Sequence, residues 1–304
     1  MQYMTKAIRI YKTVILFGLL FSQGLLAAEY KVVVRAHHGI DKAIKLWQPT
    51  IDVLSKQLPQ HRFTFKPMLS LTEITAAAAR GEFDFVLTNP SSYVEIEQLS
   101  DAKALVTLNN KRANTAQDRF GSVIFTHVRN EDILSIKDLK GKTLMAVSEP
   151  AFGGWRVAWL EMLEHGFNPY SDLKNLIFTA GKTQPEVVWA VRDGKADVGV
   201  VRTDRLERME ATGEIDMRYF RILNNKNIKN FPFFLSTKLY PEWAFAAMKS
   251  VPVELTQEVK KILLSIPNNS TAAKSGKYIG WVAPKDYSSV KELMQKLKVG
   301  PYAK

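Results

Sequence analysis

Hydrophobic and polar residues follow one another in blocks that predict strands and helices in turn. The β-branched stretch 31–36 (KVVVRA) predicts a first strand. Apolar residues recur at helical spacing from Ile44 to Leu58, which predicts a helix that buries Trp47. Residues 72–80 (TEITAAAAR) favour a second helix. Further buried strands are predicted at 83–88, 143–147 and 197–201, and a last helix at 290–297. This alternation predicts an α/β fold with parallel sheets covered by helices.

A weak internal repeat predicts two similar lobes. Residues 76–89 and 189–202 both contain a helix end, a Gly-x-x-Asp step, an apolar strand and a polar turn. The repeated pair is Gly81 with Asp84 and Gly194 with Asp197. The alternative is that any helix followed by a strand favours glycine at the helix C-terminus.

Two polar stretches, 109–120 and 224–230, are the candidate crossings between the lobes. The predicted architecture is therefore two α/β lobes joined by a two-strand hinge. Lobe one would contain residues 29–120 and 224–304, and lobe two, inserted between them, residues 121–223.

The first 28 residues have the pattern of a cleaved secretory signal peptide. Basic residues precede an apolar run at 13–26, and Ala27 and Ala28 supply the small residues of a cleavage site. An uncleaved membrane anchor is the alternative, but the run is shorter than the roughly 20 residues that a bilayer span needs. We therefore expect a soluble protein in the periplasm.

The composition limits the kinds of ligand, metal site and catalytic site that the chain is expected to have. The chain has no cysteine, five histidines and a formal net charge of +12. A basic surface of this kind either is simply well solvated or attracts an anionic ligand. An exported chain with no aromatic-basic motif is not expected to bind nucleic acid. Gly-x-Ser-x-Gly and His-Glu-x-x-His motifs are absent from the sequence. We expect no cofactor, no metal site and no enzymatic activity.

Four polar turns follow four of the predicted strands. Ligands of open α/β sheets bind beyond the carboxyl ends of the strands, where helix N-termini present backbone N–H groups. Asn89 suits a helix N-cap and Pro90 the first helical position. The candidate ligand-binding residues in these turns are His38, Asn89, Ser91, Ser92, Tyr93, Phe152, Gly153, Gly154, Trp155, Arg202 and Thr203. The alternatives are an ordinary helix start, plain loops, a solvated histidine pair and, for Arg202, a surface ion pair.

Three segments carry a resemblance to a known family. They are FDFVLTNPSSYVEIE (83–97), SIKDLKGKTLMAVSEPAFGGW (135–155) and ADVGVVRTDRLERM (196–209). These segments resemble the PhnD-like, phosphate- and phosphonate-binding branch of periplasmic binding proteins, and look most like the sensor domains of tetrathionate-sensor-type histidine kinases. The resemblance runs from about residue 31 to 302. It implies a type II periplasmic binding fold whose lobes close on a small oxyanion.

The resemblance also defines the expected function and a departure from the family pattern. Gln184 stands where relatives usually carry a histidine before the lobe-two strand, and we include it among the candidate ligand contacts. We expect a monomeric solute-binding protein that delivers phosphate, phosphonate or a sulfur oxyanion to an ABC transporter. The alternative is an accessory sensor that presents an oxyanion such as tetrathionate to a separate membrane histidine kinase.

Overall fold

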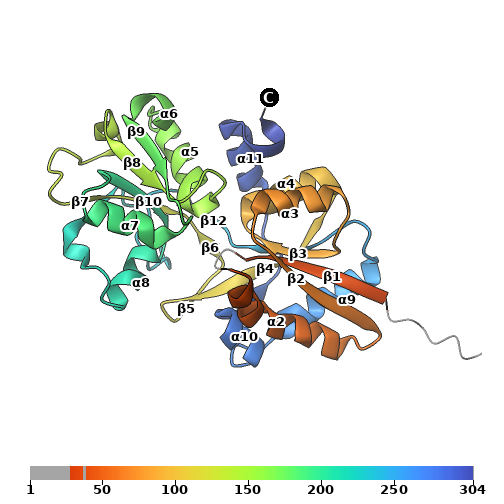
Figure 1. Ribbon diagram of the computed structural model, residues 1–304. Helices are drawn as coiled ribbons and strands as arrows, with labels where there is room; N and C mark the ends of the chain where they lie inside the picture. Colours follow the sequence, from red (N-terminus) through yellow and green to blue (C-terminus); the bar gives the residue numbers. More distant parts are fainter. Residues whose placement is uncertain (1–27, 37–38, 304) are drawn as a thin grey trace, which may run out of the picture.

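The computed structural model describes residues 28–36 and 39–303. Within them the chain forms two α/β lobes that lie side by side, and the last helix stands above the junction between them (Figure 1). Residues 1–27 of the predicted signal peptide and His38 lie outside the described residues. Among the described residues, no helix combines the length and apolar character needed to cross a bilayer.

Lobe one is built on a seven-stranded mixed sheet in the order β14-β4-β13-β3-β1-β2, with β5 paired to β4. Strands β1, β2 and β3 are parallel to one another, whereas β13, β4 and β14 join by antiparallel pairs. The strands are β1 (Ala28–Arg35), β2 (His61–Met68), β3 (Phe85–Thr88), β4 (Lys103–Arg112), β5 (Thr115–Gln117), β13 (Ala244–Ala247) and β14 (Tyr278–Val282).

Helices cover both faces of this sheet, and the pleat of β1 shows which residues face which side. Val32 and Val34 pack in the core that contains Trp47, whereas Val33 packs in the core of α3 and α4. Trp47 is buried, as predicted. The helices of this lobe are α2 (Ile40–Gln57), α3 (Leu71–Ala79), α4 (Pro90–Ser100), α9 (Val253–Ser265), α10 (Thr271–Gly276) and α11 (Ser288–Leu297), followed by the 3₁₀ turn η4 (Gly300–Tyr302).

Lobe two has a five-stranded sheet in the order β11-β7-β10-β8-β9. Its strands are β7 (Ser122–His127), β8 (Thr143–Ala146), β9 (Asn175–Phe178), β10 (Val198–Arg202) and β11 (Phe220–Leu223). Its helices are α5 (Val157–Glu164), α6 (Pro169–Asp172), α7 (Gln184–Arg192) and α8 (Arg205–Ala211), with short turns η1 (Ile136–Leu139), η2 (Phe152–Arg156) and η3 (Met217–Tyr219).

The sequence repeat corresponds to a repeated structural unit. Gly81 and Gly194 end their helices with positive φ angles of 67° and 73°, which suit glycine. The carboxylate of Asp84 then accepts the backbone N–H of Lys31 at 2.7 Å. In lobe two, Asp197 accepts the N–H of Thr143 in the same way at 2.8 Å. Each aspartate thus ties the start of its own strand to the neighbouring parallel strand, and the predicted two-lobed α/β architecture is confirmed.

The chain passes between the lobes through two short paired strands, β6 (Arg119–Phe120) and β12 (Tyr240–Pro241). Residues after β11 keep their hydrogen bonds with lobe two. Asn224 donates to the Ser236 carbonyl at 2.8 Å, and the Ser236 N–H donates to the Ser122 carbonyl at 2.9 Å. On these contacts we propose that the second crossing lies near β12 and not at 224–230. The remaining lobe boundaries stay a prediction.

Candidate functional site

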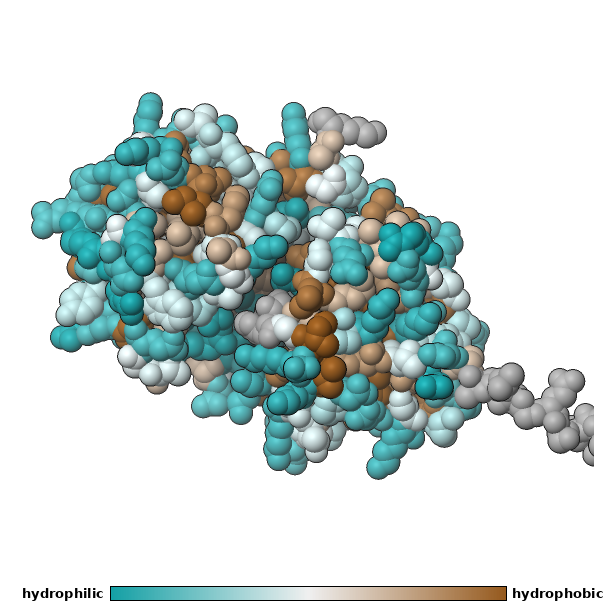
Figure 2. Space-filling model, in the orientation of Figure 1, coloured by the Kyte–Doolittle hydropathy of each residue, from teal (hydrophilic) through white to brown (hydrophobic). Residues whose placement is uncertain are grey.

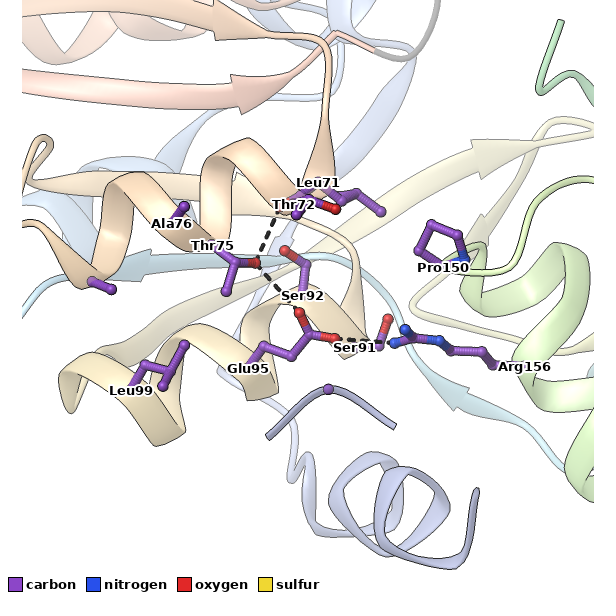
Figure 3. A pocket seen from close by; sticks show the side chains of 12 residues that line it. Leu71, Thr72, Thr75, Ala76, Ser91, Ser92, Glu95, Leu99, Pro150 and Arg156 are labelled. Atoms are coloured by element: carbon purple, nitrogen blue, oxygen red, sulfur yellow. Dashed lines mark hydrogen bonds and ion pairs between the residues drawn. The ribbon is translucent and has the colours of Figure 1, made fainter. Parts of the chain in front are cut away.

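A cavity of about 400 Å³ lies between α3 and α4 and is closed at one end by lobe two (Figure 3). The first turns of both helices form its inner end, and Pro150 and Arg156 enter from lobe two. Its lining residues are Leu71, Thr72, Thr75, Ala76, Ala79, Ser91, Ser92, Glu95, Leu99, Pro150, Arg156 and Gly300. The cavity therefore joins both lobes and the segment that follows α11. On the surface, Figure 2 shows a recess where the two lobes meet, with hydrophilic residues on the lobe-two side and a strip of hydrophobic residues on the lobe-one side.

The N-terminus of α4 is arranged by Asn89, as the sequence predicts. The Asn89 Oδ1 accepts the backbone N–H of Ser92 and the Ser91 hydroxyl, each at 3.0 Å. Pro90 occupies the first helical position. Ser92 is only 2% exposed, and its Oγ has no hydrogen-bond partner among the described residues. A buried hydroxyl that lines a cavity without a partner is available to a ligand.

One ion pair crosses the cavity from lobe to lobe. Arg156, at the end of η2, donates to the Glu95 carboxylate of α4 at 3.1 Å. Both side chains are largely buried, and Thr75 also donates to Glu95 at 3.4 Å. The positive charge of Arg156 is therefore already balanced within the cavity. Sequence reasoning missed both residues, although Arg156 directly follows the FGGW turn and Glu95 lies one helical turn beyond Ser91.

Arg202, the predicted cation of the site, lies at the hinge and is paired. Its guanidinium bonds to Glu242, lies 3.7 Å from Asp204 and stacks over the Phe120 ring at 4.1 Å. Burial alone would lower the pKa of Arg202, but the two carboxylates raise it above its ordinary value. Arg202 thus belongs to a largely buried ion pair and not to a surface one, and its contact with a ligand stays a prediction.

Gln184 and Thr203 both make hydrogen bonds at the end of β10. The Gln184 Oε1 accepts the backbone N–H of Arg202 at 2.9 Å. The Thr203 Oγ1 accepts the N–H of Gly121 at 3.3 Å, and Thr203 is only 2% exposed. The Thr203 bond holds the end of β10 against the crossing strand, and the Gln184 bond joins it to the first turn of α7. They leave the proposed ligand-contact role of both residues as a prediction.

The FGGW segment forms a π-helical turn that leads into α5, where the sequence predicts a flexible turn. Trp155 is fully buried in the lobe-two core and stacks on Trp159. Phe152 packs edge-on against Phe120, in the core shared by both lobes. A Cβ on Gly153 would lie 2.6 Å from the Phe120 ring. The residues of this turn are therefore closely packed, and their contact with a ligand stays a prediction.

Tyr93 and His38 complete the predicted set. The Tyr93 hydroxyl donates to Glu97 at 2.6 Å and accepts the N–H of Ala104 at 3.1 Å. Burial and the bond to Glu97 raise the pKa of Tyr93. His38 lies outside the described residues. Of the predicted residues, only Ser91 and Ser92 line the cavity, with Asn89 directly behind them.

A metal site is not evident in this region. Among residues 28–36 and 39–303, no group of three or more His, Asp or Glu side chains is placed to hold a metal ion. The polar groups at the cavity are hydroxyls, one guanidinium and one carboxylate, set around a helix N-terminus. This chemistry suits hydrogen bonding to a small polar ligand.

Comparison with known proteins places the chain in a family. The tetrathionate sensor histidine kinase TtrS of Salmonella typhimurium is 31% identical over 296 residues, which cover 95% of this chain and 48% of the kinase. The chain thus spans about half the length of that relative.

Solved structures share the fold at low identity. PhnD1 from Prochlorococcus marinus in complex with methylphosphonate has a TM-score of 0.67 at 16% identity, covering 90% of this chain and 99% of PhnD1. XAC2383 from Xanthomonas citri bound to ATP has a TM-score of 0.69 at 18% identity, covering 90% of this chain and 96% of XAC2383. The predicted type II periplasmic binding fold is confirmed. Residues 39–288 match the family described as ABC transporter, phosphonate, periplasmic substrate-binding protein, and the chain belongs to this family.

Proposed function

We propose that this protein is a periplasmic solute-binding protein that holds a small oxyanion at the inner end of the cavity, where α4 begins. The observation that carries the proposal is Ser92, whose buried hydroxyl lines the cavity and has no partner among the described residues. A buried hydroxyl without a hydrogen bond costs folding free energy, and a ligand oxygen would satisfy it. The protein binds its ligand without transforming it.

The position of Ser92 also favours an anion. Helix N-termini bind oxyanions because free backbone N–H groups and the helix dipole both attract negative charge. Two helices, α3 and α4, begin at this end of the cavity. The walls further along include the apolar residues Ala76, Ala79 and Leu99. A small oxyanion that carries a short apolar group fits this division between a polar end and an apolar wall.

Two partners fit such a protein. The family assignment favours an ABC permease that receives the ligand. The 31% identity to TtrS favours a second candidate, a sensor that presents an oxyanion to a separate membrane kinase. The ligand distinguishes the two candidates, because PhnD1 was solved with methylphosphonate and TtrS is named for tetrathionate.

Thermal unfolding with a panel of anions tests the proposal. The panel is phosphate, methylphosphonate, an alkyl sulfonate and tetrathionate, compared with chloride at equal ionic strength. A ligand at 100 times its dissociation constant stabilises the folded state by about 2.7 kcal/mol. We expect one member to raise the midpoint by several degrees in the wild type and by less in Ser92→Ala. An equal response of all anions, or none, would refute binding at this cavity.

A further inference from the structure

A cation that the protein leaves uncompensated near the start of α4 would strengthen the attraction of this helix N-terminus for an oxyanion. Arg156 is paired with Glu95, and Arg202 is paired with Glu242 and Asp204. Arg35, the last residue of β1, differs from both. Its Nε is buried and has no hydrogen-bond partner among the described residues. Burial lowers the pKa of Arg35, and no neighbouring carboxylate of the described chain offsets this effect.

The register of the sheet brings Arg35 beside a second unsatisfied group. Strands β1 and β3 are parallel neighbours, with Val33 opposite Val86 and Val34 opposite Leu87. The same register continued by one residue puts Arg35 next to Thr88, on strands about 4.8 Å apart. Thr88 is fully buried, and its Oγ1 has no hydrogen-bond partner among the described residues.

The pleat directs both side chains to the face that carries α3 and α4. Val33 and Val86 belong to the core of these helices, and side chains two residues apart in a strand share a face. Arg35 and Thr88 therefore lie on that face, at the carboxyl ends of their strands. The α4 N-terminus with Ser92 begins two residues after Thr88. Three polar groups that have no hydrogen-bond partner among the described residues therefore lie near the carboxyl ends of β1 and β3.

We propose that Arg35, Thr88 and Ser92 form the oxyanion-binding subsite of this protein, with Arg35 supplying the charge. The inference rests on the proposed function and names the residues that would carry it. A guanidinium held beside an oxyanion forms charge-assisted and often bidentate hydrogen bonds. The subsite also explains why the chain retains a partly buried arginine with no ion-pair partner among the described residues, since the ligand itself would be the counter-ion.

This assignment predicts opposite effects on stability and binding. A partly buried charge without a counter-ion does not stabilise the fold, so Arg35→Met should leave the unfolding midpoint of the ligand-free protein unchanged or raise it. The same variant should weaken oxyanion binding at least tenfold, which corresponds to about 1.4 kcal/mol. Arg35→Lys should recover part of the loss, because it restores the charge but not the guanidinium fork. Thr88→Val should weaken binding severalfold without loss of stability.

The test combines unfolding midpoints without ligand and calorimetric titration with phosphate, methylphosphonate and tetrathionate. Arg62→Gln, an exposed arginine on the adjacent strand β2, is the matched control and should behave as the wild type. Wild-type affinity in Arg35→Met would overturn the subsite and leave the proposed function intact. A midpoint several degrees lower in ligand-free Arg35→Met would show a structural role and also overturn it. A wild type that binds none of the probes would remove the proposed function together with the subsite.

Discussion

Arg202 of lobe two and Glu242 of lobe one form an ion pair that solvent does not reach on the carboxylate side. Glu242 is fully buried, and it also accepts the side-chain amide of Asn110. Arg112 of lobe one meets Asp204 of lobe two at 3.6 Å, and burial lowers the pKa of Arg112 to about 10. Each lobe thus supplies the arginine of one ion pair and the carboxylate of the other, and the two pairs connect the lobes at the hinge.

Breaking the first pair on one side should destabilise the protein strongly. Glu242→Gln leaves the buried Arg202 without its main partner, and the loss of one member of a buried pair costs roughly 3–5 kcal/mol. The double variant Arg202→Met with Glu242→Met should cost less than Glu242→Gln alone, because no charge is left unpaired. Urea unfolding measures the free energies of unfolding of the wild type, Glu242→Gln and the double variant. Asp216→Asn, in an exposed pair with Arg218, should change the free energy of unfolding by about 0–1 kcal/mol. A Glu242→Gln variant as stable as the wild type would contradict this account of the hinge.

Glu95 is expected to oppose anion binding. Its carboxylate lines the cavity and engages Arg156 at 3.1 Å. Glu95→Gln removes a negative charge from the cavity and frees the guanidinium, so an oxyanion should bind more tightly, by about tenfold for a newly available charged hydrogen bond. Glu97→Gln is the matched control on the same helix, because Glu97 bonds to Tyr93 and does not line the cavity. Calorimetry that shows weaker binding in Glu95→Gln would place the ligand elsewhere.

Gly153 should tolerate no side chain. A Cβ there would lie 2.6 Å from the Phe120 ring, in the core that both lobes share. Gly153→Ala therefore requires the π-helical turn or the hinge strand to shift, at a cost of about 1–3 kcal/mol. Gly280→Ala is the control, since the nearest atom to a Cβ at that position is 4.0 Å away. Equal free energies of unfolding for the two variants would show that the turn has room to relax.

Glu164 should make stability depend on pH in the acid range. Burial alone would raise the pKa of Glu164, but its hydrogen bonds to Lys296 and Lys238 lower it below its ordinary value. A lowered folded-state pKa gives stability above the unfolded-state pKa of about 4.3, which is lost as the pH falls through the folded-state value. Glu164→Gln should lose up to about 1 kcal/mol at pH 7 and show a flatter profile below pH 5. Parallel profiles in both proteins would contradict the expectation.

Much of the fold could be predicted because local signals and burial agree. The spacing from Ile44 to Leu58, the glycines before two strands and the Asn89–Pro90 helix start all correspond to observed elements. Boundaries were less certain: the strand expected at 83–88 begins at Phe85. Residue 224 onward looked like a crossing because it is polar, yet side-chain bonds from Asn224 hold it on lobe two.

The site was harder to predict because its residues act through contacts between distant segments. Arg202 and Trp155 have the residue types of a binding turn. In the structure, however, Arg202 forms an ion pair with Glu242, and Trp155 packs in the lobe-two core. The sequence places Arg35 within the first predicted strand and gives it no further role. Arg35 became a candidate because it has no ion-pair partner among the described residues, which only the three-dimensional arrangement shows.

Calorimetric titration of the purified protein with methylphosphonate, phosphate and tetrathionate tests the central claim most directly. The account predicts that one of them binds with one-to-one stoichiometry and a dissociation constant of about 1 μM or lower, equivalent to roughly −8 kcal/mol. Ser92→Ala should weaken that binding while the protein stays folded. A correctly folded wild type that releases no heat with any of the three, or whose binding is unaffected in Ser92→Ala, would contradict oxyanion binding at the start of α4.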